Sequence, residues 1–152
     1  MRREDKEIKD RTVIEAILDK SDVCRIGFSQ NNQPYIVPMI FVYKDNCIYL
    51  HSANEGRKID IIRQNNRICI EVDTMDDIIV GKKACLFGVK YKSVIGFGKA
   101  SFISSLDEKK AILDLLVQKY SEMKQWDYFK DALEKISVIK IELDDLTGKE
   151  SK

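Results

Sequence analysis

Two pairs of turn-forming residues divide the first third of the chain into short runs that are rich in β-branched and aromatic residues. Asn31-Asn32 separates residues 23–28 from residues 35–43, and Asp45-Asn46 separates residues 35–43 from residues 47–51. Asparagine and aspartate tolerate the left-handed backbone that a tight hairpin turn requires. The spacing therefore predicts two consecutive β-hairpins, which favour an antiparallel sheet.

The period of the apolar residues predicts the remaining elements. Thr12 and Glu15 have the spacing of a capping box, as have Ser105 and Glu108, and a helical pattern follows each pair. Helices are predicted over residues 13–20, residues 56–65 and from Ser105 to about Tyr120, with a shorter helical segment carrying Trp126, Phe129, Leu133 and Ile136. Strands are predicted over residues 67–73, 91–103 and 137–143, a loop over residues 74–88, and a frayed end over residues 144–152.

These elements describe a single domain over residues 1–152. About six short strands, few helices, and no repeats or Gly/Ser linker favour a mainly β fold, an antiparallel β-barrel with helices at its side and ends. Gly96 and Gly98 weaken a flat ladder, so the strand over residues 91–103 is expected to bulge or bend where the barrel turns a corner.

The charge balance and the cysteines exclude several classes of function. Lysine and arginine number 26 against 25 acidic residues, which gives no broad electrostatic reason to bind nucleic acid or a membrane surface. Residues 1–11 lack the apolar core of a signal peptide, and no stretch approaches the roughly 20 apolar residues of a membrane span, so a cytoplasmic protein is expected. Cys24, Cys47, Cys69 and Cys85 stand singly, so no metal site is expected. The role of Cys85 stays open.

The strongest chemical signal lies in residues 51–58, which read His-Ser-Ala-Asn-Glu-Gly-Arg-Lys. Two polar side chains stand at a strand end, and two cations stand at the start of the next helix. The amides and dipole of a helix's first turn attract an anion, Arg57 can add a forked hydrogen bond, and Lys58 adds a point charge. Such a pair taken alone is more often two solvated cations, so the neighbouring residues decide whether this segment is a phosphate clamp.

The preceding strand supports the clamp. Residues 36–41 read Ile-Val-Pro-Met-Ile-Phe and are apolar on both faces, as expected when one face meets the core and the other a flat apolar ligand. Pro38 interrupts the ladder and marks an edge or a bulge, where unpaired backbone groups can hydrogen-bond the polar rim of such a ligand. A phosphorylated, flat cofactor fits both features.

Over nearly the whole chain these residues resemble the FMN-binding split barrels related to pyridoxamine 5'-phosphate oxidase. The local marker is a polar pair at a strand end followed, after a gap, by Arg-Lys at a helix start, matched here by His51, Ser52, Arg57 and Lys58. Residues 5–8, Pro34 with Pro38, His51 and residues 91–98 look like the 5-nitroimidazole-resistance branch. No arginine follows Arg67, whereas the true oxidases carry further basic residues near the carboxyl terminus, so vitamin B6 oxidation is not expected.

The resemblance implies a six-stranded split β-barrel that binds FMN at the interface of a homodimer. His51, Ser52, Arg57 and Lys58 would hold the phosphate and ribityl chain. The backbone of one strand would line the flavin ring with Val37, Pro38, Met39, Ile40 and Phe41. A later strand would reach the flavin of the other subunit through Tyr91 and Ser93, with Ser93 as the preferred contact.

The function implied by the resemblance is electron transfer from NAD(P)H to a small organic acceptor, such as a nitroaromatic. Two alternatives stay open: a non-catalytic flavin-binding redox sensor or carrier, and a related split barrel that uses haem or a deazaflavin. His51 is the only histidine, and it is the candidate proton donor; a structural hydrogen bond is its other possible role.

Overall fold

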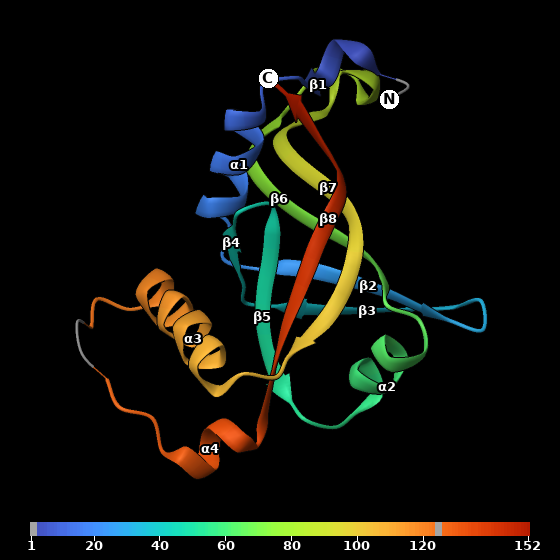
Figure 1. Cartoon of the computed structure of the whole chain (residues 1–152). Coiled ribbons are helices and arrows are strands. Elements are labelled where there is room, and N and C mark those ends of the chain that lie inside the picture. Colours follow the sequence, from blue (N-terminus) through green and yellow to red (C-terminus); the bar gives the residue numbers. More distant parts are fainter. Residues whose placement is uncertain (1–2, 124–125) are drawn as a thin grey trace.

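The computed structural model describes residues 3–123 and 126–152. Its strands form one eight-stranded antiparallel sheet, with helices at the ends and along one side (Figure 1). The strands are β1 (Glu7–Ile8), β2 (Cys24–Gln30), β3 (Gln33–Met39), β4 (Val42–Lys44), β5 (Cys47–Ala53), β6 (Arg67–Ile79), β7 (Gly88–Ile103) and β8 (Ile136–Ser151). The helices are α1 (Arg11–Lys20), α2 (Arg57–Gln64), α3 (Leu106–Tyr120) and α4 (Lys130–Glu134), with short 3-10 turns η1 (Glu4–Lys6) and η2 (Ala84–Leu86).

The sheet curls into a barrel that its hydrogen bonds do not close. The strand order is β3-β2-β6-β7-β8-β5-β4, with β1 added to β8. The two ends of this path, β3 and β4, follow one another in the chain and are joined only by Ile40 and Phe41. The predicted mainly β split barrel is therefore confirmed, with eight strands rather than the six expected.

Both predicted hairpins are present. Asn31 and Asn32 have φ of 51° and 61°, and Asp45 and Asn46 have the same pair of values. These left-handed pairs connect β2 to β3 and β4 to β5. Asn46 also donates a 2.7 Å hydrogen bond to the Leu143 carbonyl, which ties the second turn to β8.

A long arm of three strands replaces the loop and the frayed end predicted from the sequence. β6 continues to Ile79, and β7 begins at Gly88, so only residues 80–87 lie between them, with η2. Residues 144–151 extend β8 and pair with β7 and, at Gly148 and Lys149, with β1. The register of β7 against β8 shifts between Phe97 and Gly98, which is the bulge that the glycines predicted.

The helix starts differ in part from the predictions. Asp10, rather than Thr12, caps α1, because its side chain accepts from the Thr12 amide at 2.9 Å. Ser105 caps α3 as predicted, because its hydroxyl oxygen accepts a hydrogen bond from the Glu108 amide at 3.4 Å. The late helical segment is limited to α4, and Phe129 before it is 85% exposed, so its helical spacing with Trp126 does not describe a buried stripe.

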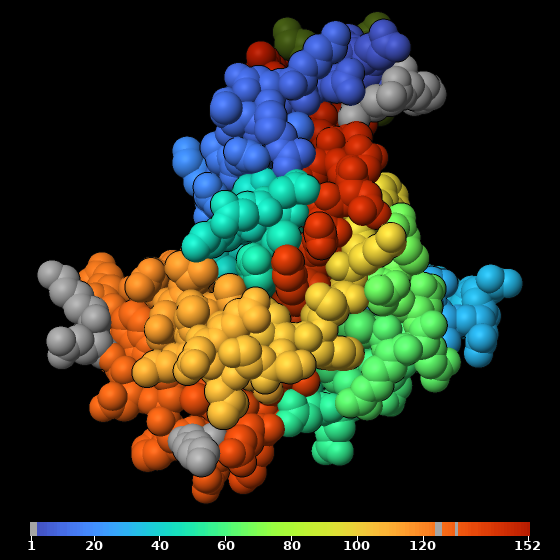
Figure 2. Space-filling view, viewed as in Figure 1, coloured from blue at the N-terminus to red at the C-terminus, as the bar shows by residue number. Residues whose placement is uncertain are grey.

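Two apolar clusters hold the fold. The larger lies inside the curled sheet, with α1 and α2 contributing Ile17, Leu18, Ile59 and Ile62 to it. The smaller lies on the outer side of β5 and β8, where α3 and α4 cover Val138 and Tyr49. Figure 2 shows α3 spread across the lower front of the molecule, with the arm and the amino-terminal segment projecting above it.

All four cysteines lie within the described residues. Cys24 and Cys47 are buried thiols, Cys69 is half-buried and Cys85 is exposed. No helix in residues 3–123 or 126–152 is long and apolar enough to cross a membrane.

Candidate functional site

A tight connection, residues 54–56, joins β5 to an uncapped start of α2. Gly56 has φ of 113°, a left-handed value that side-chain-bearing residues rarely adopt, and it lets the chain turn directly into α2. No side chain caps α2, and the carbonyl of Gly56 accepts hydrogen bonds from the amides of Ile59 and Asp60. The amides of Arg57 and Lys58 precede these bonds and have no acceptor within the helix, so they are the groups that an anion could bind.

The two predicted cations lie at this helix start and beside the predicted strand. The Arg57 guanidinium carbon is 4.5 Å from the centroid of the Tyr35 ring on β3, which is a cation–π distance. Arg57 is exposed, and Lys58 is half-buried. Neither forms an ion pair with another described residue. Arg57 thus joins the start of α2 to β3, the strand that contains Pro38.

His51 and Ser52 face opposite sides of β5 because neighbouring residues of a strand alternate. Ser52 follows Ile48 and Leu50, which belong to the inner cluster, and its hydroxyl is buried without a hydrogen-bond partner among the described residues. His51 instead faces the outer side, beneath α3. The structure therefore places Ser52, but not the His51 side chain, on the inner side of β5.

The His51 imidazole lines an open, mostly apolar pocket of about 460 Å³. Its Nδ1 is buried and has no hydrogen-bond partner among the described residues. Burial lowers the pKa of His51 below its ordinary value of 6.5, so the ring is neutral at pH 7. In a neutral imidazole one ring nitrogen donates a hydrogen bond and the other accepts one, so His51 can act as donor or acceptor toward a bound molecule.

β3 presents an edge to the clamp, as expected for the strand that contains Pro38. It pairs with β2 alone, with Pro38 opposite Arg25. Val37 and Met39 pack against the inner cluster, whereas Pro38 and Ile40 are exposed. Phe41, in contrast, is fully buried. The other backbone edge of β3 has no strand partner among the described residues; Val37, Pro38 and Met39 lie along it, and Ile40 follows in the link to β4.

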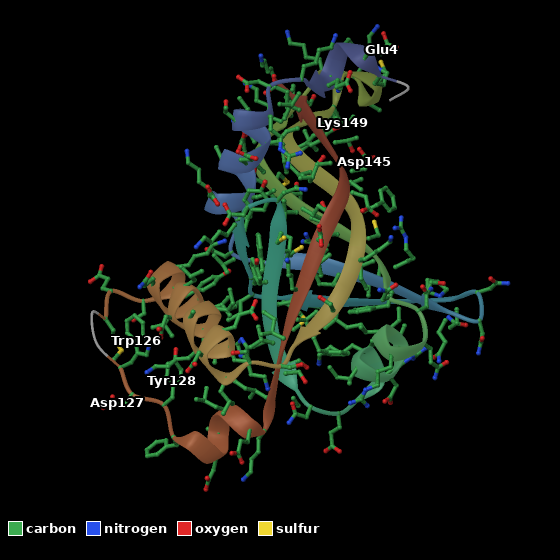
Figure 3. All side chains as sticks on the ribbon, viewed as in Figure 1. Glu4, Trp126, Asp127, Tyr128, Asp145 and Lys149 are labelled. Atoms are coloured by element: carbon green, nitrogen blue, oxygen red, sulfur yellow. The ribbon has the colours of Figure 1, made fainter. Side chains whose placement is uncertain are left out.

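Tyr91 and Ser93 lie in the arm, and no described contact joins them to the clamp of the same chain. Ser93 pairs with Asp73 of β6 and Lys149 of β8. The Tyr91 ring lies between the ammonium groups of Lys6 and Lys149, at 6.0 and 5.8 Å; Lys149 is labelled on the upper arm in Figure 3. A role for both residues at the site of a second subunit stays a prediction.

Two residues that sequence reasoning missed fix the shape of this region. The Asn54 amide donates to the Glu134 carbonyl at 2.6 Å and accepts from the Ser137 hydroxyl at 2.9 Å, which anchors the clamp loop to α4 and β8. The Tyr120 hydroxyl accepts from the Phe41 amide at 3.0 Å and lies 2.7 Å from the Asp22 carbonyl, so α3 is fastened to the β3–β4 link. Both join residues about 80 or more positions apart, and no local pattern marks them.

The residues at the helix start fit a phosphate group better than a metal ion. Free first-turn amides, two unpaired cations and the unpartnered Ser52 hydroxyl all favour an anion. No group of three histidine, cysteine, aspartate or glutamate side chains is placed to hold a metal among the residues that the structure describes.

Comparison with known proteins agrees with this architecture. The family model described as pyridoxamine 5'-phosphate oxidase matches residues 10–150. A proposed 5-nitroimidazole antibiotic resistance protein from Bacteroides thetaiotaomicron is 33% identical, and the alignment covers 94% of this chain and 85% of that one with a TM-score of 0.84. An FAD and haem binding protein from Mycobacterium smegmatis has the same fold, with a TM-score of 0.89 at 16% identity over 97% of this chain and 74% of that one.

Among curated proteins, an uncharacterized protein of Rhizobium meliloti is 28% identical over 65 residues, which are 43% of this chain and 42% of that protein. The alignment thus spans less than half of that relative. The family match extends over nearly the entire chain, from the residue that caps α1 to the penultimate residues of β8. The chain belongs to the pyridoxamine 5'-phosphate oxidase family, and it is similar in sequence and fold to the proposed 5-nitroimidazole resistance protein.

Proposed function

We propose that this protein is an FMN-dependent oxidoreductase that transfers electrons from NAD(P)H to a small organic acceptor, with a nitroaromatic as the leading candidate. The observation that carries the proposal is the uncapped start of α2, where Arg57 and Lys58 have no ion-pair partner among the described residues and Arg57 lies against Tyr35 of the edge strand β3. The relative from Bacteroides thetaiotaomicron supports the choice of acceptor.

The clamp matches the phosphate of FMN. The first-turn amides of α2 would take phosphate oxygens, Arg57 would add a forked hydrogen bond, and Lys58 would add charge. A buried hydroxyl without a hydrogen-bond partner destabilises the protein by about 1 to 3 kcal/mol. A hydrogen bond from the Ser52 hydroxyl to the same ligand would remove this cost. The exposed edge from Val37 to Ile40 would hold the flavin ring through backbone groups.

When bound, the flavin would supply the electron-accepting and electron-donating chemistry, so the chain itself needs no nucleophile or metal. The contribution of this chain would be to bind the flavin and to orient it. The clamp would fix the phosphate end, and the β3 edge would fix the ring end. His51 would offer a neutral imidazole from the opposite face of β5, able to donate or accept one proton beside the β3–β4 link.

The proposal includes a homodimer. Ile36, Ile95 and Phe97 are 65%, 41% and 46% exposed, and they come from strands that are part of one continuous sheet path, β3-β2-β6-β7. An uncovered apolar sheet face is what a second copy would bury. In such a dimer the arm would bring Tyr91 and Ser93 to the flavin of the partner.

A non-catalytic flavin carrier or sensor would use the same clamp, and a haem or deazaflavin protein would use the same fold. The FAD and haem binding relative keeps haem among the outcomes to be tested. Anaerobic addition of NADH or NADPH to the purified, flavin-loaded protein separates enzyme from carrier. Bleaching of the flavin absorbance, restored by a nitroaromatic, supports the enzyme, and unchanged absorbance supports the carrier.

The clamp itself is tested by comparing FMN with riboflavin, which lacks the phosphate. Each charged hydrogen bond contributes about 1.5 to 3 kcal/mol, so Arg57→Ala with Lys58→Ala should weaken FMN binding by about 100-fold or more. Riboflavin affinity should change little. Titration calorimetry or flavin fluorescence measures both.

Arg63→Ala is the matched control, because Arg63 lies in the last turn of the same helix and pairs with Asp60 at 3.7 Å. It should leave the affinity for FMN unchanged. Equal losses for FMN and riboflavin in the double variant, or no loss for either, would contradict a phosphate clamp at this helix start.

A further inference from the structure

The pocket beneath α3 has a lining unlike that of the clamp. It lies on the outer side of β5, between the β3–β4 link, α3 and α4. Its apolar walls come from Ile40, Leu113, Leu116, Val117 and Leu133, and its volume of about 460 Å³ lies in the range of small-molecule sites. No lysine, arginine, aspartate or glutamate belongs to the described lining, so the pocket offers no partner to a charged group.

The other polar side chains around the pocket already have partners. The Tyr120 hydroxyl is held by the Phe41 amide and the Asp22 carbonyl. The Tyr128 hydroxyl lies 3.0 Å from both the Asp114 carboxylate and the Trp126 indole nitrogen. Figure 3 shows Trp126 and Tyr128 in the segment between α3 and α4. Both hydroxyls therefore already have hydrogen-bond partners within the chain.

His51 therefore differs from every other polar lining group. Its Nδ1 is buried, and it lacks a partner among the described residues. A buried nitrogen without a partner costs about 1 to 3 kcal/mol, a cost that a ligand's polar atom would remove. The ring is neutral, so the ligand's atom needs no charge to bind it.

We propose that this pocket binds an uncharged aromatic molecule that fills the apolar walls and makes a hydrogen bond with Nδ1 of His51. We assign this pocket as the site where the electron acceptor binds, because Ile40 and His51 connect it to the end of β3 and to β5. This assignment rests on the proposed function. It narrows the acceptor class to neutral aromatic compounds with one inward polar group, such as quinones or nitroarenes. Phosphorylated or carboxylated substrates are excluded from this pocket.

A matched pair of fluorescent probes tests the inference without any turnover. N-phenyl-1-naphthylamine is neutral, and 8-anilino-1-naphthalenesulfonate is nearly the same molecule with an added sulfonate. The neutral probe should bind with increased emission, and the sulfonate should bind at least 100-fold more weakly at this pocket, because no described lining residue carries a positive charge to offset its desolvation. Changed emission of Trp126, the single tryptophan, gives a second readout.

Three variants locate the probe. Val117→Phe fills the pocket and should weaken binding of the neutral probe at least tenfold, whereas Gln118→Phe, at the next and exposed position of α3, should not change it. His51→Phe keeps an aromatic ring but removes the nitrogen, and should weaken binding about tenfold. A nitroarene or quinone that displaces the probe would support the acceptor assignment.

Equal binding of the two probes, or unchanged binding in Val117→Phe, would overturn the inference. So would a failure of the neutral probe to bind the wild-type dimer. FMN binding, followed separately with the Arg57 and Lys58 variants, distinguishes the two proposals. A protein that binds FMN but not the neutral probe keeps the proposed function and loses this inference, and the reverse result keeps the pocket and loses the flavin site.

Discussion

His51 combines burial with an uncompensated ring nitrogen, and this combination makes it sensitive to protons. Burial disfavours the imidazolium, so the pKa of His51 in the folded protein lies below 6.5. The unfolded chain, where the pKa of histidine is about 6.5, binds the proton more readily. The stability that His51 contributes is therefore present above about pH 6.5, and it is lost as the pH falls through the folded pKa.

We expect the unfolding free energy to fall between pH 7.5 and pH 5 by more in the wild type than in His51→Gln, which cannot titrate. Denaturant titrations of both proteins measure this difference, and the carboxylates that they share cancel from it. Because the chain has one histidine, its imidazole NMR signal reports the folded pKa directly. Parallel pH profiles, or a pKa at or above 6.5, would contradict the burial argument.

At the scale of elements, the bulge between β7 and β8 decides how the arm leaves the barrel. Asp144 is the extra residue, since Phe97 pairs with Asp145 and Gly98 pairs with Leu143. A Cβ on Gly98 would collide with the backbone carbonyl of Glu142, which cannot move without breaking the ladder. Glycine at position 98 is therefore required by the close approach of the two strands.

Gly98→Ala should lower the unfolding free energy by at least about 2 kcal/mol, because backbone must move to relieve the contact. Gly88→Ala is the matched control on the same strand. A Cβ there would lie 3.5 Å from the Ile79 side chain, an ordinary van der Waals distance. Thermal or denaturant unfolding compares the two variants, and equal stability would show that the bulge accommodates a side chain.

At the scale of the whole molecule, one sheet surface is left without a partner. Phe97 and Ile36 are exposed on it, although aromatic and β-branched residues of this size are usually covered. Two-fold pairing of copies would bury about 800 Å² on each subunit if the interface has the standard size. A charge at the centre of such an interface would oppose pairing strongly, while the monomer would tolerate it at an exposed position.

We expect the wild type to sediment as a dimer at micromolar concentration, and Phe97→Asp to shift toward monomer by at least tenfold in dissociation constant. Phe129→Asp is the control, since Phe129 is 85% exposed and precedes α4, away from β7. Sedimentation velocity of the three proteins gives the result. A monomeric wild type, or dissociation by both substitutions, would exclude pairing through this surface.

Local signals predicted the two hairpins and the position of α2 well. The Asn31-Asn32 and Asp45-Asn46 turns and the uncapped start of α2 depend on neighbours in sequence, so backbone preferences alone indicate them. The end of β8 was missed because residues 144–151 contain a single large apolar residue, Leu146, so strand pairing rather than an apolar period orders them. The opposite directions of His51 and Ser52 follow from strand alternation, but the pocket that His51 enters depends on α3, far along the chain.

The position of β8 has a consequence for synthesis on the ribosome. β8 follows the other seven strands of the sheet in sequence, yet it lies between β7 and β5 in the finished sheet (Figure 1). A nascent chain must therefore keep two open strand edges apart until residues 136–151 emerge, and such edges readily pair with other chains. Termination of translation early in β8 would leave the β4–β5 hairpin detached from the rest of the sheet, because β5 pairs only with β4 and β8 among the described strands. A polypeptide that ends there should aggregate rather than fold.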